Sequence, residues 1–148
     1  MLQVENLGLR DGAFELTAQF QVSAGTRTAI VGPSGAGKST LLLLIAGYLT
    51  PDSGSIHWNG QDITDWPPGR RPISMLFQDN NLFPHLSVAL NVGLGLRPDL
   101  KLDQAKRVQV EDALNRVGLS GLGGRKPGSL SGGQQSRVAL ARILVQRR

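Results

Sequence analysis

A glycine-rich segment between two apolar stretches constrains this chain most. Residues 32–40 read GPSGAGKST, which fits the pattern G-x-x-x-x-G-K-[ST] at every fixed position. The apolar Thr28–Val31 before it predicts a buried strand, and the run from Lys38 predicts a helix that ends at Gly47. Glycines let backbone N–H groups approach phosphate oxygens, and the start of the helix directs its positive dipole end at the same anion. The segment therefore predicts a site for a nucleoside triphosphate.

Each residue of this loop has a predicted part in binding. We expect Lys38 to reach the β- and γ-phosphates, and the hydroxyl of Ser39 to ligate Mg²⁺. The predicted binding residues are Gly32, Pro33, Ser34, Gly35, Ala36, Gly37, Lys38, Ser39 and Thr40.

Length and composition narrow the class of protein. A chain of 148 residues with 40% hydrophobic residues suits one globular domain. The net charge of +5 is concentrated between Arg125 and Arg148, where aromatic residues are lacking. That distribution argues against a nucleic-acid-binding face. The sequence has no cysteine, which excludes disulfides and thiolate metal sites.

The order of predicted elements indicates an α/β domain with a mainly parallel sheet. Helices are expected from Asp103 to Gly118, with an apolar stripe, and from Ser131 onward. Besides the stretch before the glycine-rich loop, the predicted strands are Leu2–Leu9, Phe14–Val22, Ser55–Trp58 and Ile73–Phe77.

A second candidate phosphate surface lies near the end of the sequence. Residues 130–134 read LSGGQ, and Ser131 with Gln134 forms the S-x-x-Q pattern of a capping box that starts a helix. Gly132 and Gly133 would expose backbone donors at the positive end of that helix. The residues alone leave open an ordinary capped helix.

Three motifs in this order resemble the ATP-binding subunits of ABC transporters: GPSGAGKST, an apolar stretch ending in Gln78, and LSGGQQSRVALAR. The resemblance implies a P-loop NTPase fold of the ABC ATPase type. That fold has a mainly parallel sheet, an N-terminal antiparallel β portion and a helical subdomain. It also implies ATP and Mg²⁺ as cofactors, with Gln78 assisting Mg²⁺ and water. In a head-to-tail dimer, the partner's ATP would be contacted in trans by Ser131, Gly132, Gly133 and Gln134.

The same resemblance divides the chain and predicts what it lacks. Residues 1–77 would form the ATP-binding core with the P-loop, 78–130 the Gln loop and helical subdomain, and 131–148 the signature helix. The family has a further apolar strand ending in a catalytic Asp-Glu pair. No such strand follows the signature in this sequence, so we expect a piece of a longer subunit that is inactive alone.

Partners and cargo follow from the resemblance as well. Residues 70–88 and 91–102 resemble the ATPase subunits of bacterial thiamine importers. This implies a membrane permease, a periplasmic binding protein and a place on the cytoplasmic face of the inner membrane. The apolar Leu82, Phe83, Pro84 and Leu86 would meet the permease, although by themselves these residues also fit a place in the core. Importers of other small solutes, a soluble ABC ATPase and a non-catalytic truncated product remain alternatives.

Two further pairs of residues, Arg10 with Phe14 and Arg70 with Arg71, carry weaker expectations. Relatives place an aromatic ring near the first turn to stack on adenine, and here Phe14 is the nearest ring. The guanidinium of Arg10 is the alternative stacking group. Arg70 and Arg71 are expected to be solvated in a turn.

Overall fold

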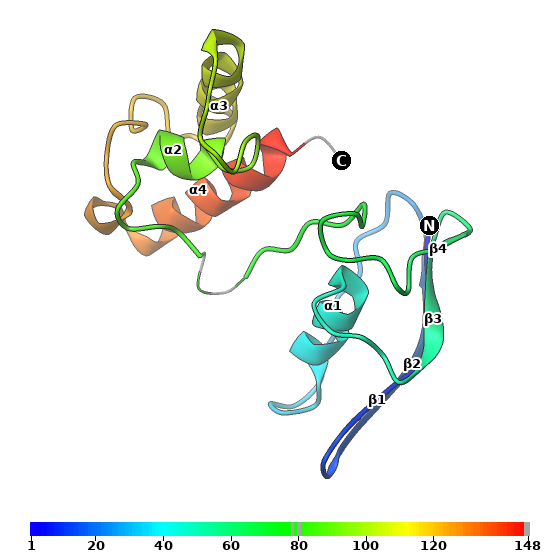
Figure 1. Ribbon diagram of the computed structural model, residues 1–148. Helices are drawn as coiled ribbons and strands as arrows, with labels where there is room; N and C mark the ends of the chain where they lie inside the picture. The colour runs from blue at the N-terminus through cyan, green and yellow to red at the C-terminus, as the bar shows by residue number, and fades with distance from the viewer. Residues whose placement is uncertain (78, 80, 147–148) are drawn as a thin grey trace. The chain divides into compact units, whose positions relative to one another are not determined.

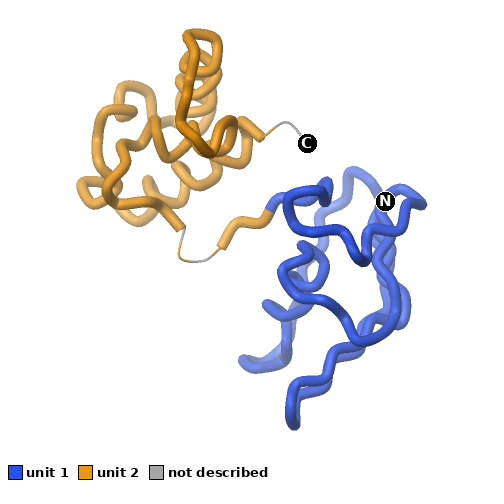
Figure 2. Tube along the Cα trace, viewed as in Figure 1, with its two compact units in different colours: residues 1–74 blue, residues 75–148 orange. Residues whose placement is uncertain are grey.

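The structure, a computed structural model, describes residues 1–77, 79 and 81–146. These residues form two compact units, Met1–Ser74 and Met75–Arg148, which Figure 2 colours separately. Among the described residues, no helix has the length and apolar character needed to cross a membrane.

The first unit is built on an antiparallel sheet (Figure 1). Strands β1 (Leu2–Asp11) and β2 (Phe14–Val22) form a hairpin, as the sequence predicts. On the other side of β1 lies β3 (Ser53–Trp58), and the short β4 (Gln61–Asp62), which was not predicted, pairs with β3. The strand order is therefore β2-β1-β3-β4, and the expected antiparallel N-terminal portion is confirmed.

One helix packs on this sheet. Helix α1 (Lys38–Ala46) ends at Gly47, whose φ of 84° is the left-handed conformation that glycine adopts readily. Its buried Leu44 and Ile45 join a core with residues of the strands and the following loop: Val4, Leu7, Leu16, Ile56 and Ile63. The helix that follows the glycine-rich loop is thus fixed to the sheet by its C-terminal half.

Arg71 corrects the expectation of a solvated turn. Arg70 is exposed, but Arg71 is only 1% exposed. Burial lowers the pKa of Arg71, and the nearby Asp65 and Asp62 oppose that shift. Its guanidinium donates at 2.5 to 2.8 Å to the backbone carbonyls of Leu44, Ile45, Thr64 and Trp66. Two of these carbonyls belong to the last turn of α1, so Arg71 satisfies the C-terminal end of that helix.

This contact predicts different effects for two adjacent arginines. Arg71→Met leaves buried carbonyl oxygens without donors, and should lower the free energy of unfolding by at least about 1–3 kcal/mol. Arg70→Met, at an exposed position, should change it by less than about 0.5 kcal/mol. Denaturation followed by the fluorescence of Trp58 and Trp66, both in the first unit, measures the difference. Equal effects of the two substitutions would contradict the capping role.

Two predicted strands, 28–31 and 73–77, are not strands in the structure. The four-stranded sheet is antiparallel and takes in neither segment, so the described residues show no parallel pairing. Val31 is 88% exposed and Leu76 is 46% exposed, although both were expected to be buried. An apolar sequence favours burial, but a strand forms only where a neighbouring strand accepts its hydrogen bonds.

The second unit is helical. It contains α2 (Val88–Gly93), α3 (Gln104–Arg116), a 3₁₀ turn η1 (Pro127–Ser129) and α4 (Gly132–Val145). Helices α3 and α4 were predicted, and Asp103 caps α3 by accepting from the N–H of Lys106. The sequence did not predict α2 or η1.

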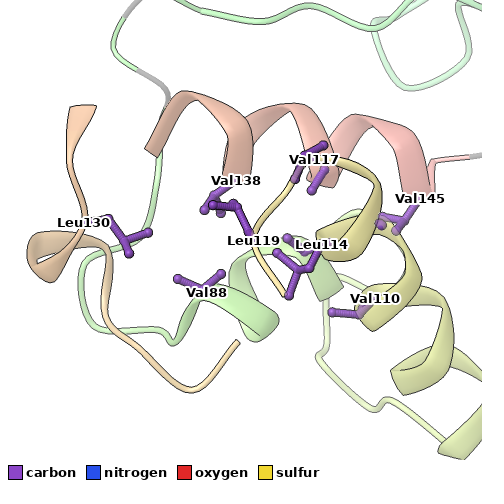
Figure 3. Packing of buried hydrophobic residues seen from close by; sticks show 11 residues of the cluster. Val88, Val110, Leu114, Val117, Leu119, Leu130, Val138 and Val145 are labelled. Carbon is purple, nitrogen blue, oxygen red and sulfur yellow. The ribbon is translucent and has the colours of Figure 1, made fainter. Parts of the chain in front are cut away.

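These helices enclose an apolar core, shown in Figure 3. The predicted stripe of α3 points into it, with Leu114 fully buried and Val110 3% exposed. Val88 of α2 and Val138 of α4 meet this stripe. The helix that begins at the LSGGQ segment is therefore held by packing along its length.

Candidate functional site: a phosphate loop at the start of α1

The glycine-rich loop takes the form that its sequence predicts. Gly35 and Gly37 have φ values of 81° and 84°, a conformation that other residues adopt only with strain. A Cβ atom on Gly37 would lie 2.8 Å from the side chains of Leu16 and Phe14. Glycine at 37 therefore lets the loop pack directly on β2.

The first turn of α1 is left open to an anion. Gly37 has no side-chain cap, and the first turn contains no acidic residue. Within the described residues, the backbone N–H groups of Lys38, Ser39 and Thr40 find no acceptor. Unpaired N–H groups at the positive end of a helix bind phosphate well.

Lys38 adds a full positive charge to the loop. Its ammonium donates to the carbonyl oxygens of Gly32 at 2.8 Å and of Pro33 at 2.6 Å. These bonds fold the side chain back over the loop. An ammonium has three donors, so one remains for a phosphate oxygen while both carbonyls are bound.

A pocket of about 480 Å³ lies against this loop. It is lined by Asp11, Phe14 and every residue from Ser34 to Thr40. Phe14 thus reaches the pocket. Arg10 does not line it, and pairs instead with Glu15 at 2.8 Å on an exposed surface. Of the two candidate stacking groups, only Phe14 is placed beside the loop.

Of the two residues predicted to ligate the metal ion, one lines this pocket. Ser39 supplies a hydroxyl oxygen at the start of α1, while Gln78 lies outside the described residues. No group of three or more His, Cys, Asp or Glu residues able to hold a metal occurs in the described part of the chain. Mg²⁺ in nucleotide sites takes few protein oxygens and several from phosphates and water, so this sparse set fits it.

The LSGGQ segment forms a second open helix start, in the other unit. The capping box is complete: the Ser131 hydroxyl accepts from the Gln134 N–H at 3.3 Å, and the Ser131 N–H donates to Oε1 of Gln134 at 2.9 Å. Gly132 and Gly133 are exposed, with nothing within 4 Å of a Cβ built on either. Their N–H groups have no acceptor among the residues described.

The sequence match decides the family. The family model described as ABC transporter matches residues 17–148. The chain belongs to the ABC transporter family. The predicted P-loop fold is thereby confirmed, and membership implies nucleotide binding by this ABC domain.

Similar proteins carry more specific names. The chain is 55% identical over 148 residues to the thiamine import ATP-binding protein ThiQ of Ruegeria sp. (strain TM1040), covering all of this chain and 64% of that protein. It is 58% identical over 125 residues to ThiQ of Escherichia coli (strain K12), covering 84% of this chain and 54% of that one. This ABC domain thus spans less than two thirds of these relatives.

Solved structures agree on the fold. The dimeric post-hydrolysis state of the ATP-binding cassette MJ0796, bound to ADP and phosphate, matches with a TM-score of 0.81 and 29% identity. That match covers 99% of this ABC domain and 70% of the solved chain. CbiO1 from Clostridium perfringens, part of the ABC transporter complex cbiONQ, matches with a TM-score of 0.81 and 35% identity. That match covers 98% of this ABC domain and 61% of the cbiO1 chain.

The two helix starts predict different effects on nucleotide binding. Lys38→Ala in the full-length subunit should weaken ATP binding by about tenfold or more, because it removes a charge-assisted contact to phosphate. Ser131→Arg should leave ATP binding by the monomer nearly unchanged, because Ser131 is not among the residues that line the pocket at the loop. Equilibrium dialysis with labelled ATP measures both. Unchanged affinity in Lys38→Ala would contradict this account of the loop.

Proposed function

We propose that this chain is part of the ATP-binding subunit of an ABC importer that couples ATP binding and hydrolysis to thiamine uptake. The observation that carries the ATP-binding part is the open first turn of α1, with the Lys38 ammonium folded back onto the loop before it. A helix start without a side-chain cap or an acidic residue in its first turn leaves its donors for a ligand, and phosphate is the anion that matches them.

In this proposal, residues 32–40 surround the phosphates of ATP. The N–H groups of Lys38, Ser39 and Thr40 bind phosphate oxygens, and the Lys38 ammonium neutralises their charge. Mg²⁺, when bound, would offset charge on the phosphates, with Ser39 as its ligand and Gln78 as a second. Phe14, which lines the same pocket, would support the adenine ring.

The second half of the ATP site comes from a second copy of the subunit. Ser131, Gly132 and Gly133 would present the start of α4 to the phosphate held by the partner's Lys38. Gln134 keeps its amide nitrogen for this contact, because its capping bond uses only Oε1. A dimer among the structural neighbours supports this arrangement.

The proposed importer also contains a permease and a binding protein. A membrane permease would dock near residues 81–87, where Phe83 is 45% exposed, and a periplasmic binding protein would complete the importer. The subunit would lie on the cytoplasmic face of the inner membrane. Residues 1–77 would act as the ATP-binding core, 78–130 as the Gln loop and helical subdomain, and 131–148 as the signature helix.

Thiamine, free or as its pyrophosphate, is the proposed cargo, because relatives at 53–59% identity carry that name. The second candidate is an importer of another small solute. Its support is the match to cbiO1, which is part of a differently named ABC transporter complex, cbiONQ.

Uptake by cells tests the cargo. A strain lacking its thiamine-importer ATPase should accumulate labelled thiamine when it receives the full-length subunit with the permease and binding protein encoded beside it. Lys38→Ala should abolish this uptake. Rescue of another solute's uptake without thiamine uptake would keep the ATPase assignment and reject the cargo.

A further inference from the structure

Asn91 of α2 is a buried amide that shapes the loop before its helix. Its side chain is 0% exposed. Its Oδ1 accepts from the N–H of Phe83 at 2.8 Å, and its amide nitrogen shares its two hydrogens among the carbonyls of Phe83, Leu86 and Ser87 at 3.0 to 3.2 Å. One side chain thus binds four backbone groups and fixes the conformation of residues 83–87. A buried polar group satisfied this fully makes its surroundings rigid.

Arg142 of α4 joins this arrangement from the opposite side. Its guanidinium donates at 2.9 Å to the Asn91 carbonyl, to Oδ1 of Asn91 and to the carbonyl of Asn81. It also lies 5.7 Å from the centre of the Phe83 ring, within the range of a cation–π contact. The described residues supply no carboxylate to Arg142, so its half-buried charge is stabilised by this loop.

Other contacts bind the same loop close to the LSGGQ segment. The Lys126 ammonium donates to the His85 carbonyl at 2.6 Å, five positions before Ser131. The turn that follows α2 approaches α4 closely as well, since a Cβ on Gly95 would lie 2.4 Å from the carbonyl oxygen of Arg142. Loop 81–87 is therefore tied both to the last turns of α4 and to the segment that precedes its first turn.

The outer face of the loop stays accessible. Phe83 is 45% exposed, and His85 meets its ring edge-on with the ring centres 5.9 Å apart. The backbone side of the loop is held by Asn91 and Arg142, while its aromatic side faces outward. A partner that moves this loop must therefore move α4 with it, or break several buried hydrogen bonds.

We propose that Arg142 and Asn91 are positioning residues that make loop 81–87 and the signature helix α4 move as one body. Docking of the permease on the loop then sets the position of Ser131 and Gly132 at the other end of the helix. This inference rests on the proposed function, because it needs a permease on the loop and an ATP-bound partner at the signature.

The first test compares ATP hydrolysis by the full-length subunit alone and with its permease in lipid vesicles. Arg142→Lys keeps the charge but replaces a planar three-nitrogen group with a single ammonium that cannot span the same acceptors. Stimulation by the permease should fall about fivefold or more, while ATP affinity of the isolated subunit is unchanged. The matched control is Arg116→Lys on α3, an exposed arginine without a hydrogen bond or ion pair to described residues. It should retain full stimulation.

Full stimulation in Arg142→Lys would overturn the proposal. A purely structural role predicts something else: a lower thermal midpoint, with the ratio of stimulated to unstimulated rates preserved. If the wild-type subunit hydrolyses ATP but the permease never stimulates it, the proposed function is what fails.

A second test does not depend on whether the variant folds. The 148 residues contain no cysteine, so cysteines introduced at His85 and Arg137 in an otherwise cysteine-free subunit can carry two spin labels. The distance between the labels in the permease complex should be narrow and unchanged by ATP. A distance that shifts or broadens when ATP is added would show that loop and helix move separately, and would overturn the proposal.

Discussion

Within the described part of the chain, the backbone groups at the C-terminal end of helix α1 have hydrogen-bond partners and those at its N-terminal end do not, and the site depends on that difference. At its C-terminus, the last carbonyls are bound by the N–H groups of Gly47 and Tyr48 and by Arg71. At its N-terminus, no described group accepts from the first N–H donors, and the Lys38 ammonium binds the carbonyls of Gly32 and Pro33 in the adjacent loop. The sheet holds the satisfied end through Leu44 and Ile45. The rigid half of the helix thus keeps the open half aimed at the pocket.

Each unit also contains an arginine bound to backbone carbonyls. Arg71 closes α1 in the first unit, and Arg142 joins α4 to loop 81–87 in the second. The planar fork of arginine suits this role, because several of its donors reach different carbonyls at once. In both cases the arginine fixes the helix whose opposite end presents open N–H groups. Binding surface and support are therefore built on the same two helices.

Local chemistry was predictable from the sequence, and long-range pairing was not. The glycine-rich loop, the Gly47 cap, the Asp103 cap and the Ser131 capping box depend on residues a few positions apart, and the structure contains all of them. Segments 28–31 and 73–77 were predicted as strands because they are apolar, but neither is a strand in the structure. A strand also needs a partner strand to pair with, and the local sequence does not identify that partner. Arg71 was misread for the same reason. Two of its acceptors lie 26 and 27 positions away, and only the fold brings them together.

In the proposed dimer, the two open helix starts bind one ATP from opposite subunits, and mixing two defective subunits tests this arrangement directly. Lys38→Ala removes the ammonium of the phosphate loop, and Ser131→Arg places a bulky side chain at the signature. Neither full-length variant alone can therefore build an intact site. A head-to-tail dimer of the two variants contains one intact site, with the wild-type loop of the Ser131→Arg subunit and the wild-type signature of the Lys38→Ala subunit. The mixture should therefore retain labelled ATP in a dimer, while each variant alone does not. A mixture that retains no more ATP than its separate components would show that the two helix starts do not share one ATP.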